Sequence, residues 1–89
     1  MPRVSEFYGI VVSLYFLDQK QHAEPHFHAR YAEHEAVFRI PDAEVLAGSL
    51  PRSQRRMVEA WAEIHRTELA ENWARVAAGR EAFKIPPLQ

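Results

Sequence analysis

The stretch HFHARY, residues 26–31, decides the fold because its side chains alternate strictly in character along the chain. Its apolar and polar members fall on opposite sides: Phe27, Ala29 and Tyr31 against His26, His28 and Arg30. An alternation of period two is typical of a β-strand with one buried and one exposed face. The sequence therefore predicts a strand whose two histidines and arginine point away from the core.

A second apolar alternation, residues 36–40 (AVFRI), is predicted to pair with this strand as a β-hairpin. Matching the two apolar sets places Tyr31 opposite Ala36 and leaves residues 32–35 as the loop. This register puts two cross-strand pairs on the face away from the core, namely His28 with Arg39 and Arg30 with Val37.

Further strands are predicted on both sides of this hairpin. Residues 7–16 (FYGIVVSLYF) are rich in β-branched and aromatic side chains and predict one strand, with Gly9 marking a bulge near its start. Residues 18–25 are polar and predict a loop, and residues 44–47 follow a predicted turn and predict a short fourth strand.

The second half of the chain has helical periodicity. Pro51 suits the first helical position, and apolar residues then recur at helical spacing: Met57, Val58, Trp61, Ile64, Leu69, Trp73 and Val76. An unbroken helix over residues 51–78 would be about 42 Å long. We therefore favour two helices with a break at residues 65–67 and Thr67 as the cap of the second; one kinked helix is the alternative.

These elements predict an α+β fold in a single domain, residues 1–89. A small antiparallel sheet of three to four strands, within residues 7–47, is followed by the helical region, residues 51–79, packed on one face. Gly79 predicts the end of the last helix, and residues 80–89 form an extended tail that contains two prolines.

Composition and charge exclude several classes of protein. The chain has 89 residues, no cysteine and a formal net charge of -1 at pH 7. Without cysteine there is no disulfide and no thiolate metal site, and a net charge near zero does not indicate general attraction to nucleic acid. No apolar run approaches the roughly 18 residues of a membrane span, so we expect a cytoplasmic protein that contacts no membrane.

The histidine pair is the sharpest chemical feature of the sequence. On a strand, His26 and His28 would lie about 6.6 Å apart on one face, close enough to hold one metal ion. Zinc needs at least one further ligand, and four residues of the adjoining loops are candidates: Asp18, His22, Glu24 and His34. The alternative is a pair of solvated histidines, and no cofactor is expected unless zinc occupies this pair.

The same face also has the residue types of a metal-free ribonuclease. Histidine titrates near neutral pH and serves as a general acid or base, while Arg30 and Arg39 are predicted to stand beside His26 and His28 and hold a phosphate. A solvated sheet face with the same composition is again the alternative.

Three arginines, Arg52, Arg55 and Arg56, lie in the first turns of the predicted helix. The amide groups and the dipole at a helix N-terminus favour anions, so these residues are a candidate site for an anion or nucleic acid. The alternative is that Arg55 and Arg56 form ion pairs with Glu59.

The chain resembles a small prokaryotic family catalogued as domain of unknown function 4160. The matching residues are Phe7-Tyr8-Gly9-Ile10, Pro25-His26-Phe27-His28, Tyr31, Glu35-Ala36-Val37, Leu50-Pro51, Trp61, His65, Asn72-Trp73 and Ile85-Pro86-Pro87-Leu88. The chain departs from the family pattern at Glu24, where the family has proline, and at Ala32 in the predicted hairpin loop, where it has glycine.

The resemblance implies a partner rather than an activity. Genes of this family often lie beside a gene for domain of unknown function 2442, and the two are suspected of forming a toxin-antitoxin-like module. Our leading hypothesis is therefore a non-enzymatic component of a regulatory or toxin-antitoxin-like complex. It would bind a small protein from an adjacent gene through its sheet edge or through the tail residues Ile85, Pro86, Pro87 and Leu88.

The alternative hypothesis is a small ribonuclease or metal-dependent enzyme that uses His26, His28 and Arg30. A homo-oligomer is a further expectation to be tested. Nucleic-acid binding through the helical arginines would show as an affinity that falls steeply with salt.

Overall fold

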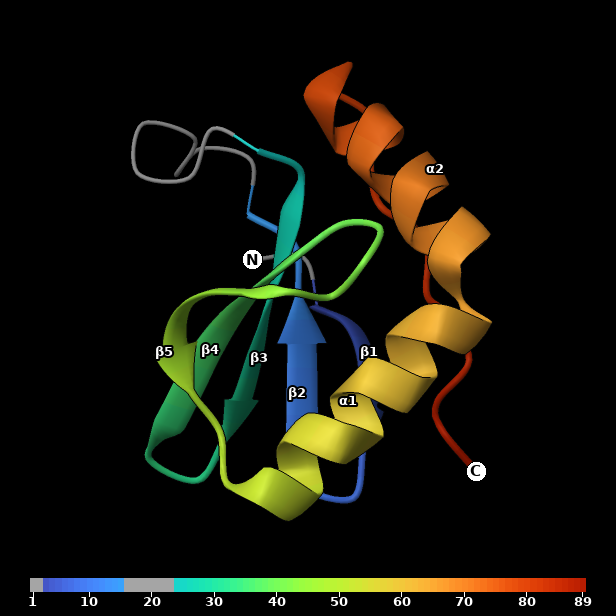
Figure 1. The fold of residues 1–89 in the computed structure, drawn as a ribbon. Coiled ribbons are helices and arrows are strands. Elements are labelled where there is room, and N and C mark those ends of the chain that lie inside the picture. Colours follow the sequence, from blue (N-terminus) through green and yellow to red (C-terminus); the bar gives the residue numbers. More distant parts are fainter. Residues whose placement is uncertain (1–2, 16–23) are drawn as a thin grey trace.

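The computed structural model describes residues 3–15 and 24–89 and confirms the α+β class. Five strands are followed by two helices (Figure 1). Their bounds are β1 Arg3–Phe7, β2 Ile10–Ser13, β3 His26–Tyr31, β4 His34–Arg39, β5 Val45–Ser49, α1 Arg52–Ile64 and α2 Arg66–Ala77. The strands form one antiparallel sheet in the order β1-β2-β3-β4-β5, so each strand pairs with its neighbours in sequence.

The sheet gains its fifth strand because the first predicted strand is in fact a hairpin. Tyr8 and Gly9 join β1 to β2 in a tight turn with φ angles of 50° and 79°, and Phe7 pairs with Ile10. Positive φ at both residues is the conformation that tight two-residue hairpins require, and glycine adopts it without steric cost. Gly9 therefore marks a turn and not a bulge; the predicted loop lies mostly outside the described residues.

The central hairpin forms, but the predicted register is wrong by two residues. Tyr31 pairs with His34 and Ala29 with Ala36, so the loop contains only Ala32 and Glu33. Ala32 takes a φ of 53°, the left-handed conformation that glycine favours. A shift of two residues keeps every side chain on its predicted face, because faces alternate with period two.

The last strand occupies Val45–Ser49 and runs further than the predicted residues 44–47. Gly48 and Ser49, which lie beyond the end of the predicted strand, pair with Ala36 and Glu35 of β4. Gly48 allows this because the strands approach closely there, and an added Cβ would lie 2.2 Å from the backbone oxygen of Glu35.

Two helices form, as predicted, and their boundary lies at His65. This residue has φ -108° and ψ 30°, and its ring Nδ1 contacts the Glu68 carboxylate at 2.6 Å. Thr67 is not the cap, because α2 already begins at Arg66, and Pro51 precedes α1 instead of occupying its first position. Ile64, predicted on the apolar stripe, is 66% exposed because the chain changes direction directly after it.

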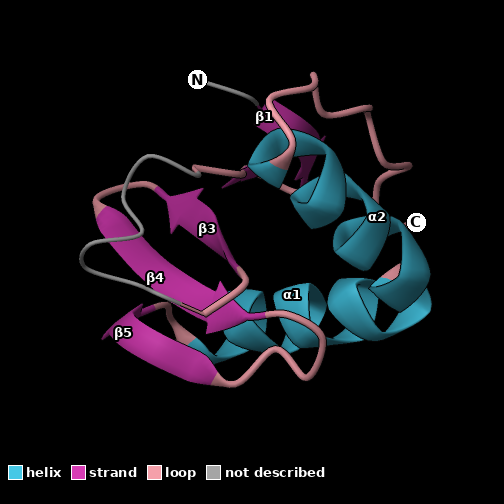
Figure 2. Cartoon of the chain, turned by 90° about the horizontal axis from the view of Figure 1, so that it is seen from above, coloured by secondary structure: helices cyan, strands magenta, loops and turns pink. Residues whose placement is uncertain are grey.

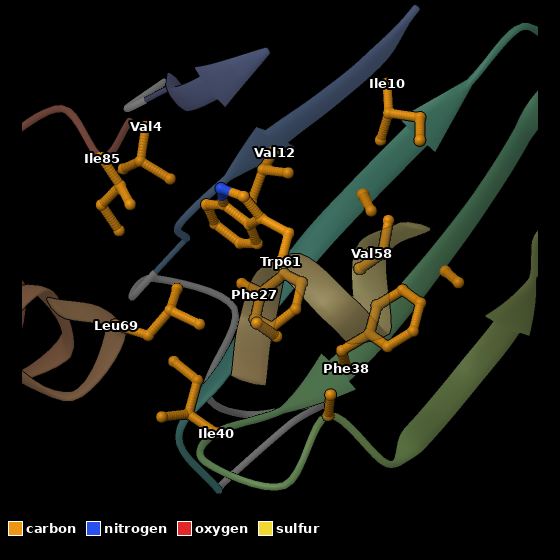
Figure 3. Packing of buried hydrophobic residues seen from close by; sticks show 14 of the residues in the cluster. Val4, Ile10, Val12, Phe27, Phe38, Ile40, Val58, Trp61, Leu69 and Ile85 are labelled. Carbon is orange, nitrogen blue, oxygen red and sulfur yellow. The ribbon is translucent and has the colours of Figure 1, made fainter. Parts of the chain in front are cut away.

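The helices cover one face of the sheet, and the core lies between the two layers (Figures 1 and 2). Trp61 of α1 is fully buried at its centre, among side chains that include Val12, Phe27 and Leu69 (Figure 3). Phe27 stacks on Phe38 with ring centroids 5.2 Å apart. Neither helix in the described part of the chain has the length and apolar character required to cross a bilayer.

The tail packs against its own domain. The backbone N–H of Ile85 donates to the Val4 carbonyl over 2.8 Å, and the Ile85 side chain is only 2% exposed. The indole N–H of Trp61 donates to the Pro86 carbonyl, and the buried side chain of Asn72 holds both backbone groups of Phe83. The tail is therefore part of the fold.

Candidate active site

The face of the sheet opposite the helices carries a small hollow that gathers polar side chains from β1 to β4. Its volume is about 110 Å³, and it is lined by Arg3, Val11, Ser13, Tyr15, His28, Arg30 and Glu35. We call it the outer hollow. Its position follows from strand register, because Arg30 lies between Val11 and Glu35 in the sheet, and His28 lies one pleat further along β3 beside Ser13.

His28 is held in place from two sides. Its Nδ1 lies 3.1 Å from a carboxylate oxygen of Glu35, and the ring meets the edge of Tyr15 at a centroid distance of 4.4 Å. Its side chain keeps 14% of its surface exposed. A ring whose Nδ1–H is donated to a carboxylate carries the lone pair of its neutral form on Nε2. The contacts with Glu35 and Tyr15 therefore fix the orientation of the His28 ring.

His26 does not share the exposure that we predicted for the pair. It is completely buried, its Nδ1 contacts the backbone oxygen of Glu24 at 2.8 Å, and its ring lies 5.1 Å from that of Trp73. The prediction fails because Trp73 of α2 packs on this residue. Helix α2 rises beside the end of the sheet where β3 begins (Figure 1). The rings of His26 and His28 are 5.4 Å apart.

The described residues supply no third ligand for a metal at the histidine pair. His34 lies opposite Tyr31, at the far end of the hairpin from His26. The Glu24 carboxylate forms an ion pair with Arg39. The other two candidates, Asp18 and His22, lie outside the described residues, so zinc binding stays a prediction.

Arg39 pairs with His26 and not with His28, and it does not line the outer hollow. Its guanidinium contacts three carboxylates, those of Glu24 at 3.3 Å, Asp42 at 2.7 Å and Glu44 at 2.6 Å. The hydrogen bond from Arg39 lowers the pKa of Asp42 from 3.8 to about 2, and its reciprocal effect raises the pKa of Arg39. Arg39 therefore joins three carboxylates, and its phosphate-binding role stays a prediction.

This carboxylate cluster makes stability depend on pH in the acid range. Because the folded-state pKa of Asp42 is below its unfolded value of 3.8, the unfolded chain takes up the proton first as pH falls. The contribution is complete above 3.8 and is lost as pH falls through about 2. We expect Arg39→Gln to lower the free energy of unfolding at neutral pH by more than it does at the lowest pH.

Urea titrations of both proteins across this pH range measure that difference. Arg80→Gln is the matched control, since Arg80 is exposed and forms no ion pair in the described part of the chain. A difference between wild type and Arg39→Gln that stays constant with pH would contradict the assignment.

Arg30 lies on the face of the sheet that the sequence predicted. It is exposed, pairs with Glu35 and lines the outer hollow. Five lining residues were missed, namely Arg3, Val11, Ser13, Tyr15 and Glu35. Arg3 forms an ion pair with Glu6 at 3.2 Å. The signal for Glu35 was its position directly before the second apolar alternation, but the predicted register assigned it to the loop.

The helical arginines are exposed at the start of α1, as predicted. Within residues 3–15 and 24–89, none of Arg52, Arg55 and Arg56 forms an ion pair, so the alternative pairing with Glu59 does not occur. Arg52 and Arg55 line a second hollow beside the end of β5. Anion binding at this place stays a prediction.

Two of the tail residues predicted to bind a partner, Ile85 and Pro86, make contacts within the domain itself. Ile85 is buried, and the Pro86 carbonyl accepts the Trp61 indole N–H, while the side chains of Pro86 and Pro87 are exposed and Leu88 is half-buried. A partner protein from an adjacent gene stays a prediction.

The fold and the outer hollow define a small α+β domain with a histidine-carboxylate pair on the open face of its sheet. Residues 9–74 match the family model described as Domain of unknown function (DUF4160), and the chain belongs to this family. Comparison with curated proteins and comparison with solved structures each gave no match. The matched region contains Tyr15, His28, Arg30 and Glu35; Arg3 and the tail lie beyond it.

Proposed function

We propose that the outer hollow cleaves the phosphodiester backbone of RNA with His28 as the general base. The observation that carries the proposal is the 3.1 Å contact between His28 Nδ1 and the Glu35 carboxylate, in a hollow that two arginines also line. A volume of about 110 Å³ suits a phosphate group, since pockets for whole drug-sized ligands span roughly 300–1,000 Å³.

The proposed reaction uses the ribose of the substrate as the nucleophile. Nε2 of His28 takes the proton of the 2′-hydroxyl, the 2′ oxygen attacks phosphorus, and the bond from phosphorus to the 5′ oxygen breaks. The leaving oxygen takes a proton from water, which yields a 2′,3′-cyclic phosphate and a 5′-hydroxyl end. Glu35 keeps the ring oriented and stabilises the imidazolium that forms.

The arginines supply the positive charge that this reaction needs. Negative charge accumulates on the phosphate oxygens in the transition state, and guanidinium groups that donate hydrogen bonds to them lower the barrier. Arg30 is exposed at the hollow, and Arg3 approaches it from β1. The substrate is RNA because DNA has no 2′-hydroxyl to act as the nucleophile.

The experiment is cleavage of a labelled single-stranded RNA by the purified chain in the presence of EDTA. We expect His28→Ala to reduce the rate by about 10²–10⁴-fold, the usual contribution of a general base. Glu35→Gln should cause a smaller loss, because the amide still contacts the ring but does not stabilise its charged form. Mass spectrometry of the products should show 2′,3′-cyclic phosphate ends.

His34→Ala is the matched control, because His34 lies exposed on the same hairpin and does not line the hollow. It should cleave at the wild-type rate, and thermal melts of all variants establish that each one is folded. Equal cleavage by His28→Ala and wild type, or cleavage of the matching DNA, would rule out this mechanism.

A further inference from the structure

A second hollow lies where β5 ends and α1 begins. Its volume is about 350 Å³, and it is lined by Val45, Gly48, Ser49, Leu50, Arg52 and Arg55. Arg56 lies one helical turn after Arg52, on the same side of α1. We call this place the basic hollow.

The charge of the basic hollow is not compensated. Arg52, Arg55 and Arg56 are exposed, and the first turn of α1 contains no acidic residue. No carboxylate in the described ranges lies within ion-pair distance of them, whereas Arg39 contacts three carboxylates. These three uncompensated positive charges attract a polyanion locally, although the chain as a whole has a net charge of -1.

The two hollows are neighbours across the sheet. Arg30 of β3 pairs with Glu35 of β4, and Glu35 pairs with Ser49 of β5. Glu35 lines the outer hollow and Ser49 lines the basic hollow, and paired strands lie about 4.8 Å apart. Gly48 and Ser49 line the basic hollow on the edge strand beside Glu35, and neither has a side chain large enough to block a passing strand.

The charges at the two ends of β5 have opposite signs. Asp42 and Glu44 precede the strand and share Arg39 with Glu24, which leaves an excess of negative charge there. The arginines follow the other end. A phosphate backbone that leaves the outer hollow is therefore repelled from the start of β5 and attracted towards α1.

We propose that the basic hollow is a second phosphate-binding subsite, so that single-stranded RNA held at the outer hollow continues over Gly48 and Ser49 to Arg52 and Arg55. This inference rests on the proposed function, because it takes RNA as the ligand of the first site. Arg56 adds a further contact on the same side of the helix.

The test measures binding separately from cleavage. A fluorescent single-stranded RNA of about ten nucleotides, 2′-O-methylated throughout so that it cannot be cut, is titrated with the chain at several salt concentrations. Each lost phosphate contact flattens the plot of log affinity against log salt by about 0.7 for a single strand. We expect the double variant Arg52→Gln/Arg55→Gln to bind at least tenfold more weakly at low salt and to lower the slope by about 1.4.

Arg80→Gln is the control, since Arg80 is an exposed arginine that follows the end of α2. Helix α2 ends at the opposite end of the helical layer from the start of α1 (Figure 1). With cleavable RNA, the double variant should raise KM for the long substrate and leave kcat unchanged. Turnover of a dinucleotide, too short to reach both hollows, should equal that of wild type.

The outcomes separate this inference from the proposed function. Weaker, less salt-dependent binding in the double variant supports the subsite even if the chain cuts no RNA, which would overturn only the cleavage mechanism. Binding by the double variant equal to that of Arg80→Gln, with the same salt slope, overturns the subsite even if His28 proves essential for cleavage.

Discussion

Replacing Trp61 with alanine is expected to remove most of the stability of this domain. The side chain is fully buried, with ring centroids 5.4 Å from Phe7 and 5.9 Å from Phe27. Truncation of a buried tryptophan to alanine typically costs about 3–5 kcal/mol. Since small domains have total stabilities of about 5–15 kcal/mol, the urea midpoint should fall sharply or the chain should be unfolded without denaturant.

Trp61→Phe separates packing from hydrogen bonding at the same position. Phenylalanine keeps an aromatic ring in the core but has no N–H to donate to the Pro86 carbonyl, which now accepts over 2.9 Å. We expect a loss of about 1–2 kcal/mol, the cost of one unmade buried hydrogen bond together with imperfect repacking. A loss for Trp61→Ala no larger than that for Trp61→Phe would show that the ring does not support the core.

Replacing Gly48 with alanine is expected to separate β5 from β4. The residue has a φ of 71°, and its added Cβ would lie 2.2 Å from the Glu35 backbone oxygen and 3.2 Å from Ala36 Cα. The left-handed conformation alone costs a non-glycine residue about 1–2 kcal/mol. The backbone clash adds to this, so we expect a loss in free energy of unfolding of about 3 kcal/mol or more, since an overpacked contact costs a further 1–3 kcal/mol.

Gly79→Ala is the matched control for this effect. Gly79 has a φ of 79°, and a Cβ there would meet no atom within 4 Å, so only the conformational cost of about 1–2 kcal/mol applies. Urea denaturation of both variants gives the comparison. If Gly48→Ala and Gly79→Ala lose the same free energy of unfolding, the contact between Gly48 and β4 leaves room for a side chain and the predicted clash is wrong. Because Glu35 carries the contact with His28, Gly48→Ala should also reduce the proposed RNA cleavage at temperatures where the variant remains folded.

The errors in the predicted sheet have a common physical origin. Residues 7–16 have the composition of one strand, and the turn at Tyr8 and Gly9 interrupts that composition with only one glycine. The predicted register of β3 and β4 was wrong by two residues. Apolar alternation shows which side chains share a face, and a shift of two residues leaves every side chain on the same face, so the alternation fits both registers equally well. That error moved Glu35 into the loop and hid its contact with His28.

The local pattern of side chains was sufficient for the class of fold, the inward face of β3 and β4, and the pair of helices, because periodicities of two and 3.6 residues act over short distances along the chain. It was also sufficient to place His28 and Arg30 on the outer face. Only tertiary structure decided that Trp73 covers His26, that three carboxylates surround Arg39, and that Glu35 orients His28. These contacts join separate elements, and they exist only after register and helix packing have been chosen by the core as a whole.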